Sequence, residues 1–277
     1  MRRALFCLPL FCAIIGLLPA FSLVANKKLS DPVARTIPRP RDPAAAPTEV
    51  LIAAAADLKF AMDSLVAAFS RDNPSITVKV VYGSSGNFFE QISNGAPFDL
   101  FFSADLDYAR RLYQQHKTLS EVKPYGTGQL VLWSKKLDPA AAGINTLLNS
   151  AVTKIAIANP AHAPYGKRAE ETLQYYHLYD QVKDKLVLGE NIAQAAQYAG
   201  SGAADVGIIA LSLALSPTMR LEGGKYWLIP AAAHQPLVQS YVLLPHAKDN
   251  AGASAFAAFF SSAKAAAVLQ MFGFGKP

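Results

Sequence analysis

The feature that most constrains this fold is a regular alternation of short apolar runs with helical patterns, which starts at Val50. Residues 50–54 have the composition of a buried strand, and apolar side chains then recur at helical spacing from 58 to 69. Strands that alternate with helices favour a largely parallel sheet covered on both faces, so the predicted class is α/β. Further strands are predicted at 76–82, 98–102, 129–133, 154–158, 185–188, 206–210 and 237–244, and further helices at 86–93, 103–115, 166–176, 192–199, 250–261 and 263–272.

The length of the chain is sufficient for more than one core. Its 277 residues leave room for two lobes, and the strand and helix pattern restarts after Gly126-Thr127-Gly128. Open α/β folds bind ligands beyond the carboxyl ends of their strands. We therefore predict two αβ lobes with a ligand cleft between them.

The first 47 residues differ from the rest. Residues 1–25 carry two arginines, an apolar run and then small residues, which predicts a signal peptide. An uncleaved membrane anchor stays open, because residues 4–25 approach the ~20 residues that span a bilayer. Both alternatives place the body outside the cytoplasm, and both cysteines, Cys7 and Cys12, fall in this segment. Residues 26–47 contain five prolines and few large apolar side chains, which predicts an extended tether.

The charge of the body excludes one class of partner. The chain has 26 basic and 20 acidic residues, but seven of the basic and two of the acidic residues precede residue 48. The body from residue 48 on therefore has 19 basic and 18 acidic residues. A basic groove for nucleic acid is therefore not expected. The five histidines, at 116, 162, 177, 234 and 246, show no metal-ligand spacing, and we predict no direct metal ligands.

Four predicted helix N-termini rich in small residues follow predicted strands. The first N–H groups of a helix have no partner within it and carry partial positive charge, so several such ends aimed at one point would bind an anion. Ordinary helix capping explains each end taken alone. Their occurrence together favours reversible capture by neutral donors over catalysis. The four stretches are Ala55-Ala56-Asp57, Gly83-Ser84-Ser85-Gly86, Ala163-Pro164-Tyr165-Gly166 and Glu190-Asn191-Ile192-Ala193.

An exported serine hydrolase that uses Ser84 or Ser85 is the alternative from another class. Asn87 stands where the last glycine of a G-x-S-x-G elbow would be, and no Gly-Lys-Ser/Thr follows to make a phosphate-binding loop. No histidine is placed by the sequence to activate either serine. The chain is therefore predicted not to be an enzyme.

Several stretches of the body match a known family. From residue 49 to residue 277 the sequence resembles the periplasmic molybdate-binding proteins that supply ATP-driven importers. The stretch from Asn94 to Asp105 is the most specific. The matching stretches are 53–58, 83–86, 94–105, 128–133, 158–160, 163–166 and 201–207.

This resemblance implies a type II periplasmic-binding-protein fold, with lobe 1 at residues 48–127 plus 236–277 and lobe 2 at 128–235. The chain would cross between the lobes near 126–129 and 230–237. The function implied is capture of molybdate or tungstate by a periplasmic monomer, for the membrane permease of an importer, without a cofactor. The oxyanion-binding positions that carry over are Ala56, Asp57, Ser85, Tyr165 and Ile192.

Two positions depart from the family pattern. Some members have a hydroxyl residue where Asp57 stands, and some bind through a tyrosine where this chain has Ala210. A buried carboxylate that faced a dianion would be repelled in a low dielectric. We therefore expect Asp57 to turn its carboxylate back to cap its own helix and to offer the ligand its backbone N–H. A sulfate or other oxyanion binder, and a sensor that signals to a membrane partner, stay open as alternatives.

Overall fold

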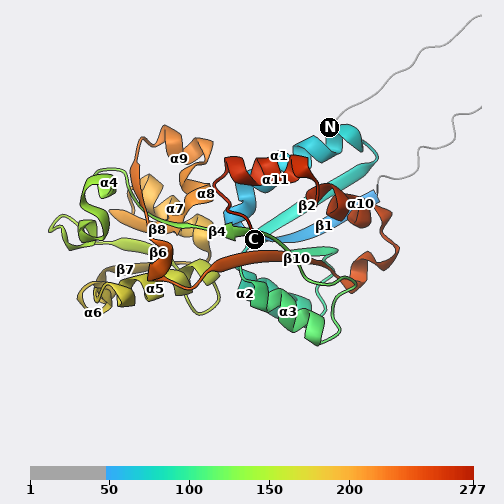
Figure 1. Cartoon of the computed structure of the whole chain (residues 1–277), viewed down its shortest axis with the longest axis horizontal. Helices are drawn as coiled ribbons and strands as arrows, with labels where there is room; N and C mark the ends of the chain where they lie inside the picture. Colours follow the sequence, from blue (N-terminus) through green and yellow to red (C-terminus); the bar gives the residue numbers. More distant parts are fainter. Residues whose placement is uncertain (1–47) are drawn as a thin grey trace, which may run out of the picture. The chain divides into compact units, whose positions relative to one another are not determined.

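The computed structural model describes residues 48–277, so the predicted signal peptide or anchor, the tether and both cysteines lie outside the described residues. The described chain forms two five-stranded sheets, each covered by helices (Figure 1). The α/β class and the two αβ lobes are thereby confirmed. The strands of the first sheet are β1 (Thr48–Ala55), β2 (Ile76–Gly83), β3 (Leu100–Ser103), β4 (Lys123–Gly128) and β10 (Leu237–Leu243). Those of the second are β5 (Leu130–Ser134), β6 (Ile155–Ala158), β7 (Leu186–Gly189), β8 (Val206–Ala210) and β9 (Lys225–Leu228).

The first sheet has the order β2-β1-β3-β10-β4 and separates two layers of helices. Successive side chains of a strand point to opposite faces, which divides the core. Ile52 and Phe102 pack with α1, α10 and α11, whereas Ala53 and Phe101 pack with α2 and α3. Figure 1 shows these two groups on opposite faces of the sheet. The helices are α1 (Lys59–Asp72), α2 (Ser85–Ser93), α3 (Leu106–Gln114), α10 (Ala251–Phe260) and α11 (Ala263–Met271).

The second sheet has the order β7-β6-β8-β5-β9. Every residue of β5, β6 and β8 is buried, as expected for strands covered on both faces. In Figure 1, α7 lies on one face of this sheet and α5 on the other. The helices of this lobe are α4 (Pro139–Ala142), α5 (Pro164–Tyr175), α6 (Tyr179–Val182), α7 (Ile192–Ser201), α8 (Leu211–Ala214) and α9 (Pro217–Leu221).

The prediction of largely parallel sheets was wrong, because both sheets are mixed. β1 runs parallel to β2 and β3, and β6 runs parallel to β7 and β8. β10 is antiparallel to β3 and β4, and β5 is antiparallel to β8 and β9. A parallel neighbour needs a crossover connection, usually a helix, whereas β10 and β5 are reached directly from the other sheet. The pattern also missed β4, in which exposed, half-buried and buried residues are mixed, and β9, which is short and mostly exposed.

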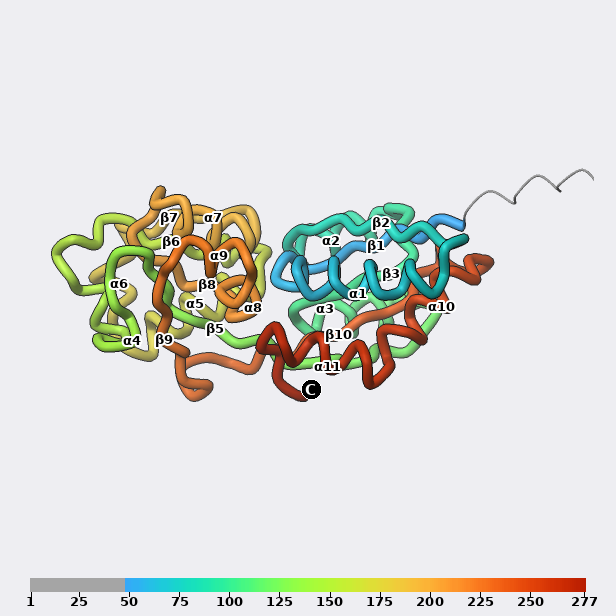
Figure 2. Tube along the Cα trace, turned by 90° about the horizontal axis from the view of Figure 1, so that it is seen from above, coloured from blue at the N-terminus to red at the C-terminus, as the bar shows by residue number. Residues whose placement is uncertain are grey.

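The chain passes from the first sheet to the second at Gln129 and returns through residues 229–236. The C-terminal residues form hydrogen bonds with the first of these two connections. Thr127 and Gly275 form an antiparallel bridge, and the Gln129 side-chain amide donates a hydrogen bond to the Gly273 carbonyl at 2.9 Å. Figure 2 shows the C-terminus beside α11, near the chain that leads into β5. The end of the chain therefore packs on the connection between the lobes.

Among the described helices, none is by itself long and apolar enough to cross a membrane; α10 and α11 satisfy length and composition only when taken together, across a 63° bend.

Candidate functional site

Residues from all four predicted helix N-termini line one small cavity, of about 10 Å³ in this structure. They follow the carboxyl ends of β1 and β2 in the first lobe and of β6 and β7 in the second. The five residues predicted from the sequence are all in this lining, so the tertiary structure brings them together. Whether they bind a ligand remains a prediction. The lining residues are Ala55, Ala56, Asp57, Gly83, Ser84, Ser85, Ala104, Ala163, Pro164, Tyr165 and Ile192.

Ser85 is oriented by a second segment of the first lobe. It is the first residue of α2, is fully buried, and follows Ser84, the N-cap whose Oγ accepts the Asn87 N–H at 3.4 Å. The Ser85 Oγ accepts the backbone N–H of Ala104, just after β3, at 2.9 Å. Since that contact uses an acceptor position of the hydroxyl, the Ser85 proton is available for another acceptor. Ser85 is thus a hydrogen-bond donor placed at the cavity.

The second lobe contributes two helix N-termini. α5 begins with Pro164 after Ala163, so the missing N–H of proline falls where no intrahelical partner exists, and Tyr165 follows in the first turn. Asn191 caps α7 by accepting the N–H groups of Ala193 at 3.0 Å and Gln194 at 3.1 Å. Ile192 is the first residue of α7 and does not donate to this cap. The first-turn N–H groups of Tyr165 and Ile192 therefore suit an anion.

The predicted helix-capping role of Asp57 was wrong. Asp57 lies inside a short 3-10 helix, η1 (Ala56–Leu58), and no described side chain caps η1 or α1. Its Oδ2 instead accepts hydrogen bonds from the Tyr165 hydroxyl at 2.9 Å and from Gln239 Nε2 at 2.6 Å. Two donors from other elements therefore hold the carboxyl group in the interior. The sequence carried no signal for Gln239, which lies 182 residues away.

Burial changes the acidity of this carboxyl group. Asp57 is 1% exposed, and desolvation raises its pKa from 3.8 to about 6. The hydrogen bonds from Gln239 and Tyr165 oppose this rise, as do the nearby backbone N–H groups of Asp57 and Leu58. None of the described residues makes a hydrogen bond of normal geometry to Asp57 Oδ1. Burial also raises the pKa of Tyr165, which stays a neutral donor.

The sequence placed no histidine to activate either serine, but the structure brings one close to Ser84. His162 Nδ1 of the second lobe lies 2.8 Å from Ser84 Oγ of the first. The backbone N–H of Gly86 donates to the His162 carbonyl at 2.9 Å, so the two contacts join the lobes. Within residues 48–277 no carboxylate hydrogen-bonds to His162, so the third member of a catalytic triad is missing. His162 is 78 residues from Ser84, and no local pattern predicts the contact.

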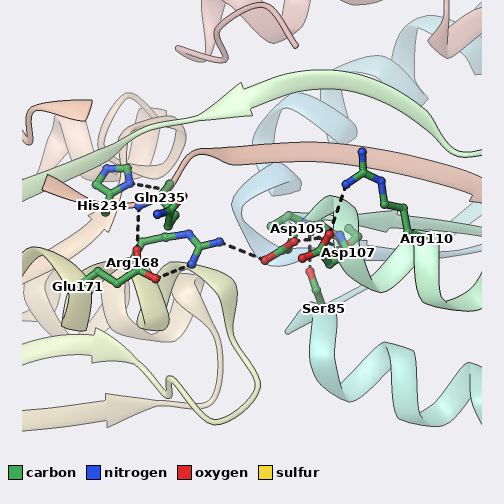
Figure 3. A network of polar contacts seen from close by, with 10 residues as sticks. Ser85, Asp105, Asp107, Arg110, Arg168, Glu171, His234 and Gln235 are labelled. Carbon is green, nitrogen blue, oxygen red and sulfur yellow. Dashed lines mark hydrogen bonds and ion pairs between the residues drawn. The ribbon is translucent and has the colours of Figure 1, made fainter. Parts of the chain in front are cut away.

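A polar network also connects the lobes beside the cavity (Figure 3). Arg168 on α5 forms ion pairs with Glu171 at 2.7 Å and with Asp105 of the first lobe at 3.4 Å. Glu171 also accepts the backbone N–H of Gln235, in the returning connection, at 2.8 Å. Arg168 therefore links the second lobe both to the first lobe and, through Glu171, to the connection. Asp105 belongs to the stretch that resembles the family, whereas no sequence pattern pointed to Arg168, Glu171 or Gln235.

Comparison with known proteins decides the family. The sequence pattern of the bacterial extracellular solute-binding protein family matches residues 50–275. The chain belongs to this family. It is 35% identical to the molybdate-binding protein of Azotobacter vinelandii over 236 aligned residues. The alignment covers 84% of this chain and 92% of that protein. It is 34% identical to the molybdate-binding protein of Rhodobacter capsulatus, across 83% of this chain and 89% of that one.

A solved structure agrees with this assignment. The periplasmic molybdate-binding protein of Azotobacter vinelandii matches with a TM-score of 0.76 and 30% sequence identity, over 82% of this chain and 99% of that one. In the present chain, which belongs to the solute-binding protein family, the cavity between the lobes offers hydroxyl and backbone N–H donors. Within the described part of the chain, no group of three or more His, Cys, Asp or Glu side chains could hold a metal ion. The chemistry of the lining suits an anion held by hydrogen bonds.

Proposed function

We propose that this protein captures molybdate, or tungstate of similar size and charge, and delivers it to the membrane permease of an ATP-driven importer. The observation that carries the proposal is the convergence of four strand-to-helix turns from both lobes on one small cavity. A tetrahedral dianion accepts hydrogen bonds from every side, and these turns supply donors from several directions. The names of the two relatives above support the choice of anion.

The proposed ligand contacts are the Ser85 hydroxyl and the backbone N–H groups of Ala56, Asp57, Tyr165 and Ile192. Capture is reversible and requires neither catalysis nor a cofactor. The lobes that close on the anion are residues 48–127 plus 236–277 and residues 128–235. The protein acts as a monomer outside the cytoplasm, either free after signal cleavage or anchored.

A thermal-shift panel on the purified protein tests this proposal. Ligand at ~100 times its Kd adds about 2.7 kcal/mol to native stability, roughly 5–10 °C for a protein of this size. Molybdate and tungstate should give shifts of this size and sulfate a smaller one, because the smaller ion cannot reach every donor. Hydrogen phosphate should give none, because its proton needs an acceptor. Equal stabilisation by phosphate would contradict the molybdate assignment, and no shift with any anion would remove the proposal.

The ion pair between Arg168 and Asp105 should make a small contribution to binding. The two side chains are 13% and 18% exposed, so water screens the pair only partly. Arg168→Gln should weaken molybdate binding by ~1 kcal/mol, about fivefold in Kd, because the pair joins the lobes. Calorimetry measures the change. Lys183→Gln, which removes an exposed ion pair to Asp180 inside the second lobe, is the control and should leave Kd unchanged. Equal effects of the two variants would exclude a role for this pair in closure.

A further inference from the structure

The two oxygens of the Asp57 carboxyl group have different surroundings. Oδ2 accepts hydrogen bonds from the Tyr165 hydroxyl and the Gln239 side-chain amide. The Gln239 carbonyl oxygen in turn accepts a hydrogen bond from the Tyr125 hydroxyl at 2.5 Å. Oδ1 is buried and has no hydrogen-bond partner among the described residues. Asp57 belongs to the cavity lining. A buried carboxylate ordinarily accepts at both oxygens, so an unpaired oxygen beside a ligand cavity calls for an explanation.

Each element packed against Asp57 brings neutral groups to it. The titratable groups that face it are Tyr165 on α5 and Tyr125 on β4, and burial raises the pKa of both phenols, so they stay uncharged. β10 brings the Gln239 amide, α8 brings the Ser212 hydroxyl to the Asp57 carbonyl at 2.8 Å, and α7 brings Ile192.

Cations nearby are engaged elsewhere. Lys59, at the start of α1, pairs with Asp63, and both side chains are about half exposed. No ion pair involves Asp57 within the described residues. A negative charge on Asp57 would therefore stand without a counter-charge beside a bound dianion.

We propose that Asp57 holds the oxyanion as a neutral carboxylic acid, so that anion capture takes up one proton and Oδ1–H becomes a further donor to the ligand. This inference rests on the proposed function. Two negative groups in one buried cavity repel strongly, and protonation of the weaker acid removes the repulsion. A protonated carboxyl donates one hydrogen bond and still accepts at its other oxygen, which matches the donors already placed at Oδ2.

The acidity of Asp57 agrees with this role. Its pKa of about 6 lies near neutrality without any anion. A dianion in the cavity raises this pKa further, since it favours the uncharged form. A ligand that raises a pKa binds more tightly as pH falls, over the window between the pKa of the complex and that of the free protein. Affinity for molybdate should therefore fall as pH rises above 6 and level off below 6.

Calorimetry with molybdate tests the proton directly. Titrations at pH 7 in two buffers with different ionisation enthalpies give the number of protons bound, which should be about 0.9, because a group with a pKa near 6 is about one-tenth protonated at that pH. If the complex keeps this proton up to pH 8, Kd should be roughly 50-fold higher at pH 8 than at pH 6, because the free group is about half protonated at pH 6 and about one-hundredth protonated at pH 8. Molybdate binding to the wild type without proton uptake would overturn this inference and leave the proposed function intact. Absence of binding throughout pH 6–8 would overturn both.

The Asp57→Asn variant separates protonation from other effects. The asparagine carbonyl can accept from Tyr165 and Gln239, and its amide can donate to the anion at any pH. We expect no proton uptake, a Kd independent of pH, and tighter binding than the wild type at pH 8. Asp107→Asn, at a side chain that is 76% exposed, is the matched control and should keep the wild-type pH dependence. A pH dependence that persists in Asp57→Asn would overturn the assignment, and if circular dichroism shows that this variant does not fold, the wild-type proton count decides alone.

Discussion

Gly86→Ala should weaken molybdate binding by roughly 2–4 kcal/mol, about 30-fold to 1,000-fold in Kd. This range adds the cost of an overpacked contact to the cost of a disturbed hydrogen bond. A Cβ atom at Gly86 would lie 2.5 Å from the His162 carbonyl oxygen, which belongs to the other lobe. The same backbone positions form the 2.9 Å hydrogen bond between the lobes. Two lobes joined by two connections close by hinge bending, and the added methyl group would stop this closure.

The measurement for Gly86→Ala combines calorimetry with small-angle scattering. Molybdate should reduce the radius of gyration of the wild type but not of the variant. The free energy of unfolding without anion should change little, because the lobes can separate and the remaining close contact is with the hydroxyl at the far end of the Tyr108 side chain. Gly200→Ala is the control, since it adds a methyl group to α7 against the flexible Met219 side chain within one lobe. Normal compaction of Gly86→Ala with molybdate would show that this contact does not form in the bound state.

Ser85→Ala should weaken molybdate binding by ~1.5–3 kcal/mol, the range for a hydrogen bond to a charged group. Its hydroxyl is buried, lines the cavity, and is held by the Ala104 N–H so that its proton can point to another acceptor. Calorimetry gives the change in Kd. Chemical denaturation without anion gives the separate effect on stability, which arises because the Ala104 N–H loses its acceptor.

Ser84→Ala is the matched comparison for Ser85→Ala. It removes a neighbouring hydroxyl that caps α2 and contacts His162, yet it is not a proposed ligand. Its effect on Kd should be about 1 kcal/mol or less, the usual value of a helix cap. If Ser84→Ala weakened binding more than Ser85→Ala, the proposed arrangement of donors would be wrong.

Much of the fold was predictable because its causes are local. The strand from Val50, the helix start at Ser85 and the cap at Asn191 follow from spacing, composition and hydrogen bonds within a few residues. The closeness of two of these turns within each lobe was also predictable, because the parallel strands β1 and β2, and likewise β6 and β7, place their carboxyl ends at one edge of a sheet. The C-terminal helices required the family resemblance, since their own pattern does not say which sheet they cover.

The tertiary structure alone decided which groups of the site hydrogen-bond to each other. The carboxyl group of Asp57 accepts from Tyr165 and Gln239, which are 108 and 182 residues away, and Ser84 meets His162 across the lobes. A polar residue after a strand is expected to cap the helix that follows, and the sequence favoured that role for Asp57. The actual role depends on donors brought by other elements. A capping preference acts within one turn, whereas burial and hydrogen bonds between distant segments exist only once both lobes are packed, and these set the direction and acidity of the carboxyl group.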